Sequence, residues 1–93
     1  MTMTPTFMTI VQMYQLEGMV AIGKMLNPGT NTITKNAEHA RFVIDLLEVL
    51  DAKTAGNLSD EEQRFLQNTL STLRLNFLEE FGNPSAPPPA ELA

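Results

Sequence analysis

The apolar residues of this chain fall into three blocks that have helical spacing and are separated by polar residues. In the last block, apolar side chains recur at intervals of four, three and four residues: Leu66, Leu70, Leu73 and Phe77. Such spacing places side chains on one face of a helix. In the middle block, apolar residues also recur at helical spacing: Ala40, Val43, Ile44, Leu47 and Leu50. The sequence therefore predicts an all-α fold whose helices cover about residues 7–26, 37–55 and 60–81.

The joint between the second and third predicted helices carries several signals that agree. Lys53 places a cation in the last turn of one helix, and Gly56 supplies a residue that readily adopts the left-handed conformation of helix ends. Asn57 follows, and Ser59 and Glu62 have the spacing of a capping box at the start of the next helix. These signals predict an antiparallel helical hairpin on which the three-helix arrangement is built.

The first predicted helix is apolar around most of its axis. A peripheral helix in a monomeric bundle needs only one apolar stripe, and a second exposed stripe would form a patch that soluble monomers rarely carry. We therefore expect a homodimeric bundle in which this helix is shared between subunits. The residues expected to make that contact are Phe7, Val11, Tyr14, Met19 and Ile22.

Charged residues of the hairpin predict a contact between its two helices. If the hairpin is centred on Asn57, Asp45 lies about one helical turn from the position opposite Arg74, within reach of a long side chain. This spacing predicts an ion pair that fixes the register of the helices. Asp45, Glu48 and Asp51 also form an acidic row, for which a solvated face is expected and acid–base or metal chemistry is the alternative.

Three sequence runs carry a resemblance to a known family. They are Ile44-Asp45-Leu46-Leu47, Lys53-Thr54-x-Gly56-Asn57-Leu58-Ser59-x-Glu61-Glu62 and Leu70-x-x-Leu73-Arg74. With these runs the chain resembles the bacterial domain-of-unknown-function family 1844 over about residues 7 to 81. The resemblance implies a small all-helical bacterial protein and implies no particular reaction.

Length and charge narrow the class of protein. The 93 residues are expected to form one helical domain, residues 1–81, followed by a disordered Pro-rich tail, residues 82–93. A net charge of −5 with only 6 basic residues argues against nucleic acids and anionic membrane surfaces as partners. Polar residues interrupt the first apolar block, and no signal peptide is evident, so a cytoplasmic protein without a membrane span is expected.

Few residues suggest catalysis. The absence of cysteine excludes disulfides and thiolate sites, and the single histidine, His39, argues against an internal zinc site. His39 is expected to lie on the surface, with a ligand or base role as the alternative. Pro84-x-x-Pro87 could bind as a polyproline motif, but a solvated tail is expected. We therefore predict a protein that is not an enzyme and has no cofactor or metal.

These observations favour an interaction or structural module that self-associates through its first helix, with a further, unknown protein partner possible. Methionines concentrate in that helix, and methionine adapts to irregular binding surfaces as well as to cores. The alternative function is a carrier that holds an apolar ligand, such as a fatty acyl chain, between its helices.

Overall fold

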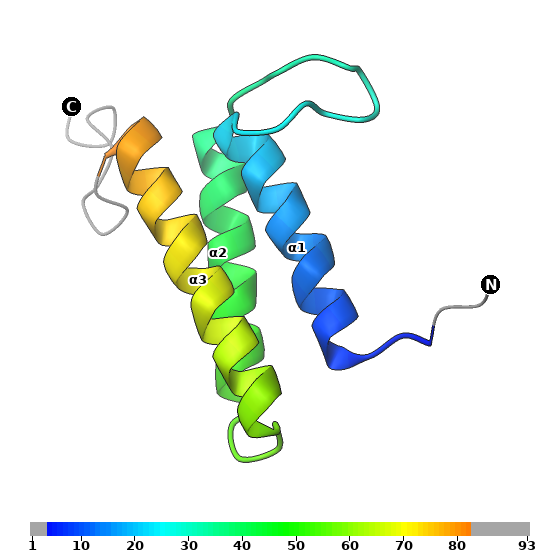
Figure 1. The fold of residues 1–93 in the computed structure, drawn as a ribbon. Coiled ribbons are helices and arrows are strands. Elements are labelled where there is room, and N and C mark those ends of the chain that lie inside the picture. The colour runs from blue at the N-terminus through cyan, green and yellow to red at the C-terminus, as the bar shows by residue number, and fades with distance from the viewer. Residues whose placement is uncertain (1–3, 83–93) are drawn as a thin grey trace.

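The computed structural model describes residues 4–82 of the chain. Over these residues the chain forms three helices, α1 (Phe7–Ile22), α2 (Ala37–Lys53) and α3 (Asp60–Phe81). Each helix packs against the other two (Figure 1). The predicted all-α, three-helix fold is therefore confirmed. The predicted tail lies, apart from Gly82, outside the described residues, as does the Pro84-x-x-Pro87 motif.

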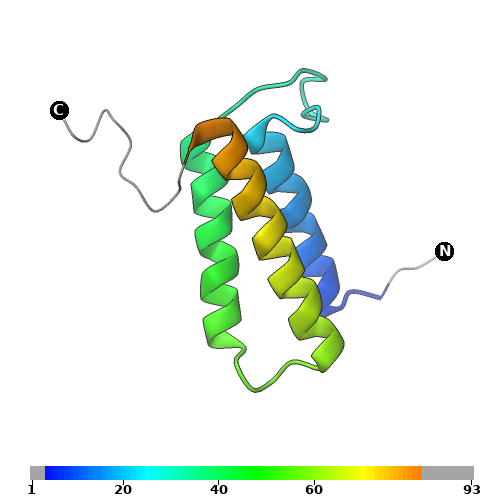
Figure 2. The same cartoon turned by 60° about the vertical axis from the view of Figure 1, so that its left-hand side comes forward.

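Helices α2 and α3 lie side by side in both ribbon views and are joined at one end of the bundle by residues 54–59 (Figures 1 and 2). Gly56 in this joint has a φ of 83°. The backbone N–H of Glu62 donates to Ser59 Oγ at 3.1 Å, and the N–H of Ser59 donates to Glu62 Oε1 at 2.9 Å. These are the reciprocal contacts of a capping box, which satisfy two of the free N–H groups at the start of α3.

Helix α1 is shorter than the sequence predicts, because it ends at Ile22 and not near Leu26. Gly23 takes a left-handed conformation with a φ of 91°. Its N–H and that of Lys24 donate to carbonyl oxygens of the last turn of α1, at 3.0 and 2.9 Å. This arrangement satisfies the free carbonyls of a helix end and stops the helix. Helix α2 likewise ends at Lys53, before the predicted Ala55.

The core lies between the three helices, and each contributes apolar residues to it. The buried apolar residues are Val11, Ala21, Ile22, Ala40, Val43, Ile44, Leu47, Leu66, Leu70, Leu73 and Phe77. Gly18 is also buried, and a Cβ atom added to it would lie 2.8 Å from Leu73 Cδ2. A side chain at this position would force Leu73 to shift, so the glycine allows α1 to pack closely against α3.

Candidate interaction surface

The outer side of α1 presents a stripe of large apolar side chains to solvent. Ile10 is 44% exposed, Met13 66% and Leu16 46%, and they follow one another at intervals of three residues. We call these three residues the α1 stripe. Most exposed apolar residues stand singly on a protein surface, whereas neighbouring ones mark interaction sites. The α1 stripe is therefore the candidate surface for a partner.

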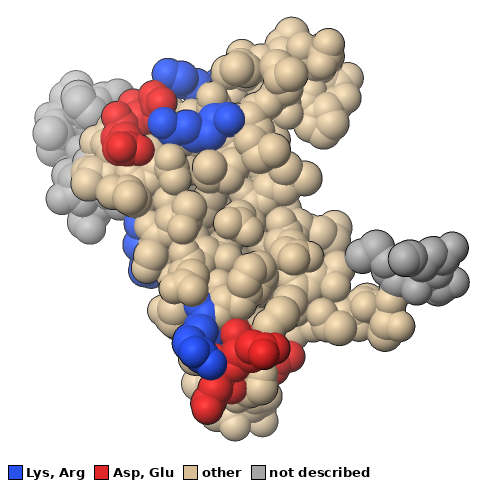
Figure 3. Space-filling model, viewed as in Figure 1, with Lys and Arg blue, Asp and Glu red and all other residues tan. Residues whose placement is uncertain are grey.

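A groove of 390 Å³ lies at one end of the α1 stripe, beneath the connection between α1 and α2. Figure 3 shows this connection overhanging the flank of the bundle, with the flank hollowed below it. Apolar side chains of Met13, Leu16, Val20 and Pro28 contribute to the lining. The polar lining includes Glu17, Thr34, Asn36 and His39.

His39 connects this groove to α2. Its Nε2 atom lies 3.6 Å from Glu17 Oε1 on α1, and its backbone N–H donates to Asn36 Oδ1 at 3.0 Å, which caps the start of α2. The His39 ring also lies 6.3 Å from the ring of Phe42, between centroids. His39 therefore stands on the surface, where the sequence places it, and contacts both helices that border the groove.

The residues predicted to contact a second subunit divide into two groups. Val11 and Ile22 are both fully buried in the core of their own chain, so this fold does not offer them to a partner. Phe7, Tyr14 and Met19 are half-buried and pack against the same core. The correction has a simple cause: α1 has two apolar sides, and the side with Val11, Gly18 and Ile22 is the one that packs inward.

The predicted ion pair between Asp45 and Arg74 is also corrected. Arg74 Nη2 donates to Glu48 Oε2, one turn further along α2 than Asp45. Asp51, the next member of the acidic row, accepts a hydrogen bond from Gln63 Nε2 at 3.1 Å. Glu48 and Asp51 therefore both contact side chains of α3, which gives them a structural role.

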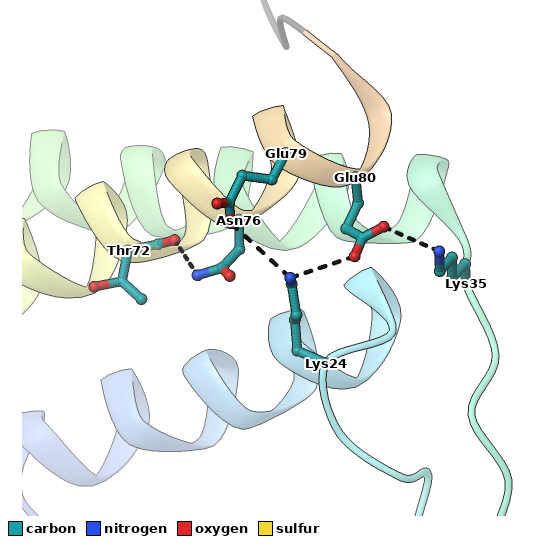
Figure 4. Close-up of polar contacts among 6 residues, drawn as sticks. All are labelled: Lys24, Lys35, Thr72, Asn76, Glu79 and Glu80. Atoms are coloured by element: carbon teal, nitrogen blue, oxygen red, sulfur yellow. Dashed lines mark hydrogen bonds and ion pairs between the residues drawn. The ribbon is translucent and has the colours of Figure 1, made fainter.

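A second charged cluster ties the connection between α1 and α2 to the end of α3 (Figure 4). Glu80 lies 3.0 Å from Lys35 Nζ and 3.3 Å from Lys24 Nζ, and Lys24 is also 3.9 Å from Glu79. The hydrogen bond from Lys35, followed by that from Lys24, holds the pKa of the Glu80 carboxyl below its ordinary value. The sequence alone does not indicate this cluster, since Lys24 and Lys35 are far from Glu79 and Glu80 in the chain.

Within residues 4–82, no three His, Asp or Glu side chains are grouped so that they could hold a metal ion. In the same range, no helix combines the length and the hydropathy that a membrane span requires.

Comparisons with known proteins place the sequence in a family. The curated proteins contain no match, and the solved structures contain none either. A family model described as a domain of unknown function, DUF1844, matches residues 4–79. This range covers all three helices except the last residues of α3. The chain therefore belongs to the DUF1844 family.

Proposed function

We propose that this chain is a small cytoplasmic helical module that acts by protein–protein contact and forms a homodimer through the outer side of α1, with the antiparallel α2–α3 hairpin as its scaffold. The observation that carries the proposal is the α1 stripe, in which three adjacent large apolar side chains are each more than two-fifths exposed. A partner that covers them removes an apolar surface from water.

The size of this effect is comparable with the cost of association. Full burial of a large apolar side chain contributes about 1.5–3 kcal/mol, so covering a half-exposed one contributes roughly 1 kcal/mol. In a symmetric dimer the three residues of the stripe are covered in both copies, which gives roughly 6 kcal/mol. Loss of translational and rotational freedom costs about 4–15 kcal/mol. The stripe alone therefore supports a weak dimer, and a stable dimer needs further contacts.

Light scattering on the full chain tests the proposal. The wild-type chain should have the mass of a dimer, and Met13→Asp should give a monomer, because a carboxylate at the centre of the stripe would lose its hydration in the dimer. Gln12→Asp is the matched control, since Gln12 is an exposed neighbour outside the stripe and should leave the dimer intact. A wild-type chain that stays monomeric at its highest soluble concentration would refute self-association.

The groove beneath the connection supports a second candidate, the carrier of an apolar ligand. Its volume of 390 Å³ falls within the range of small-molecule sites, about 300–1,000 Å³. The space between the helices is occupied by the fully buried side chains of Leu47, Leu66 and Leu73, so the ligand would lie in this outer groove. Native mass spectrometry separates the candidates: a copurified lipid supports the carrier, and a ligand-free dimer supports the interaction module.

A further inference from the structure

Helix α2 carries an outer apolar stripe of its own, formed by Phe42, Leu46 and Val49. Phe42 is 56% exposed, Val49 is 55% exposed, and Leu46 is half-buried. Their intervals of four and three residues match the spacing of the core residues of α3. We call these residues the α2 stripe. Helices that pack against one another use such spacing, and within residues 4–82 no other part of the chain covers the stripe fully.

The α1 stripe and the α2 stripe border one another. The contact between Glu17 and His39 shows that these two residues lie at the same level of α1 and α2. The His39 ring in turn lies 6.3 Å from the Phe42 ring, between centroids. Because α1 and α2 run in opposite directions (Figures 1 and 2), moving seven residues back from Glu17 and seven residues forward from His39 leads to the same level of the bundle. Ile10 and Leu46 therefore lie at similar heights on neighbouring helices.

We infer that a second copy of this chain packs on both stripes at once, so that α1 and α2 of one copy face α1 and α2 of the other in a four-helix interface. The inference rests on the proposed self-association and names its surface. A stable interface covers about 800 Å² on each partner, and a three-residue stripe on one helix is too narrow for this area. The two neighbouring stripes together supply a face two helices wide.

The charges around this face favour a second copy over a charged partner. The chain has a net charge of −5, so two copies repel one another wherever acidic residues meet. The two stripes contain no charged residue, and beside them Glu17 Oε1 lies 3.6 Å from His39 Nε2 of the same copy. The pairs of Glu48 with Arg74 and of Glu80 with Lys35 lie at other contacts, between α2 and α3 and at the end of α3. The apolar residues of the two stripes therefore bring no like charges together, and Asp45, exposed beside Phe42 and Val49 on α2, would lie at the edge of the interface.

Sedimentation equilibrium of the full chain tests the inference with Phe42→Asp and Val49→Asp. Each should weaken dimerisation at least tenfold, because each places a charge inside the interface. Leu75→Asp is the control: Leu75 is 59% exposed, equally apolar and on α3. It should leave the dimer unchanged. Far-UV circular dichroism and thermal unfolding of each variant verify the fold. Because all three positions are exposed, the substitutions should leave the chain folded, so a loss of dimer reports on the interface.

The outcomes separate this inference from the proposed function. If Met13→Asp dissociates the dimer while Phe42→Asp and Val49→Asp do not, the dimer exists and the four-helix interface is overturned. If Leu75→Asp dissociates it as strongly as Phe42→Asp does, the interface is also overturned, since α3 then takes part. A monomeric wild-type chain overturns both proposals and indicates that another protein or a ligand covers the face.

Discussion

Arg74 on α3 donates a hydrogen bond to Glu48 on α2, although Asp45, one turn earlier, is the carboxylate that the sequence suggests as its partner. This contact lies between the two helices that residues 54–59 join. Its side chains are 43% and 47% exposed, so water and salt screen the attraction. The pair is therefore expected to contribute little to the stability of the fold.

A double-mutant cycle measures this pair. Glu48→Ala and Arg74→Ala should each reduce the free energy of unfolding by less than about 1 kcal/mol, with a coupling energy of roughly 0.2–1 kcal/mol, as for other exposed pairs. Urea denaturation gives these values. The matched cycle with Asp45→Ala should show no coupling to Arg74→Ala. A coupling of Asp45 to Arg74 as large as that of Glu48 would contradict the observed pairing.

Gly18→Ala should destabilise the chain even though alanine is the better helix former. The change gains up to about 1 kcal/mol in helix propensity, but the new methyl group overlaps buried Leu73, and overpacking costs about 1–3 kcal/mol. We expect a net loss of about 1 kcal/mol in urea denaturation. The same change in a Leu73→Val background should cost less, because the smaller side chain leaves room. A more stable Gly18→Ala protein would show that α1 and α3 are not in close contact here.

Ser59→Ala should lower the free energy of unfolding by about 1 kcal/mol, because it removes the acceptor for the Glu62 N–H at the start of α3. Ser71→Ala is the control, since Ser71 is exposed in the middle of the same helix and alanine is favoured there. Thermal unfolding of both variants compares a cap with an ordinary helical position. Equal melting temperatures would mean that the capping box contributes nothing.

The Glu80 cluster should stabilise the chain at neutral pH and cease to do so in acid. The pKa of Glu80 is lower in the folded chain than its ordinary value of 4.5, so its contribution is fully present above that value and is lost as the pH falls through the lowered pKa. The melting temperature of wild type should exceed that of Glu80→Gln near neutral pH, and the difference should shrink in acid and in high salt.

Glu79→Gln is the control for this experiment. Glu79 belongs to the same turn of α3, but its contact with Lys24 is longer, 3.9 Å, and its side chain is 59% exposed. Its substitution should therefore change the melting temperature less than Glu80→Gln does. If the two variants respond alike to pH, the effect arises from the overall charge of the chain and not from the cluster.

Features that depend on neighbouring residues in the sequence could be predicted from it. The helix spacing of the apolar residues indicates the three helices, and the local hydrogen bonds of Ser59 and Glu62 indicate where α3 begins. The end of α1 was harder to predict, because Gly23 and the later Asn27-Pro28-Gly29 are both plausible stops. The structure uses Gly23, whose left-handed conformation satisfies the last turn.

Features that depend on how the helices meet could not be predicted in the same way. The sequence indicates that α1 has two apolar sides but not which one faces the core. Packing decides this, because Gly18 allows α1 to approach Leu73 closely and so turns Val11 and Ile22 inward. The residues expected to contact a partner therefore lie on the same helix as the α1 stripe, but two of them, Val11 and Ile22, are buried in the core. For α2, the spacing of Phe42, Leu46 and Val49 indicates a second apolar side of the helix.

The two ends of the connection formed by residues 23–36 are held close together by contacts that do not involve its middle. The N–H of Asn36 donates to the carbonyl oxygen of Ala21 at 2.8 Å, and Lys24 and Lys35 both contact Glu80. Since the ends are held and loop-closure entropy rises only slowly with length, the exposed tip around Gly29 should tolerate an inserted peptide. An epitope or fluorophore tag placed there would report on the chain while leaving both apolar stripes and all three helices in place.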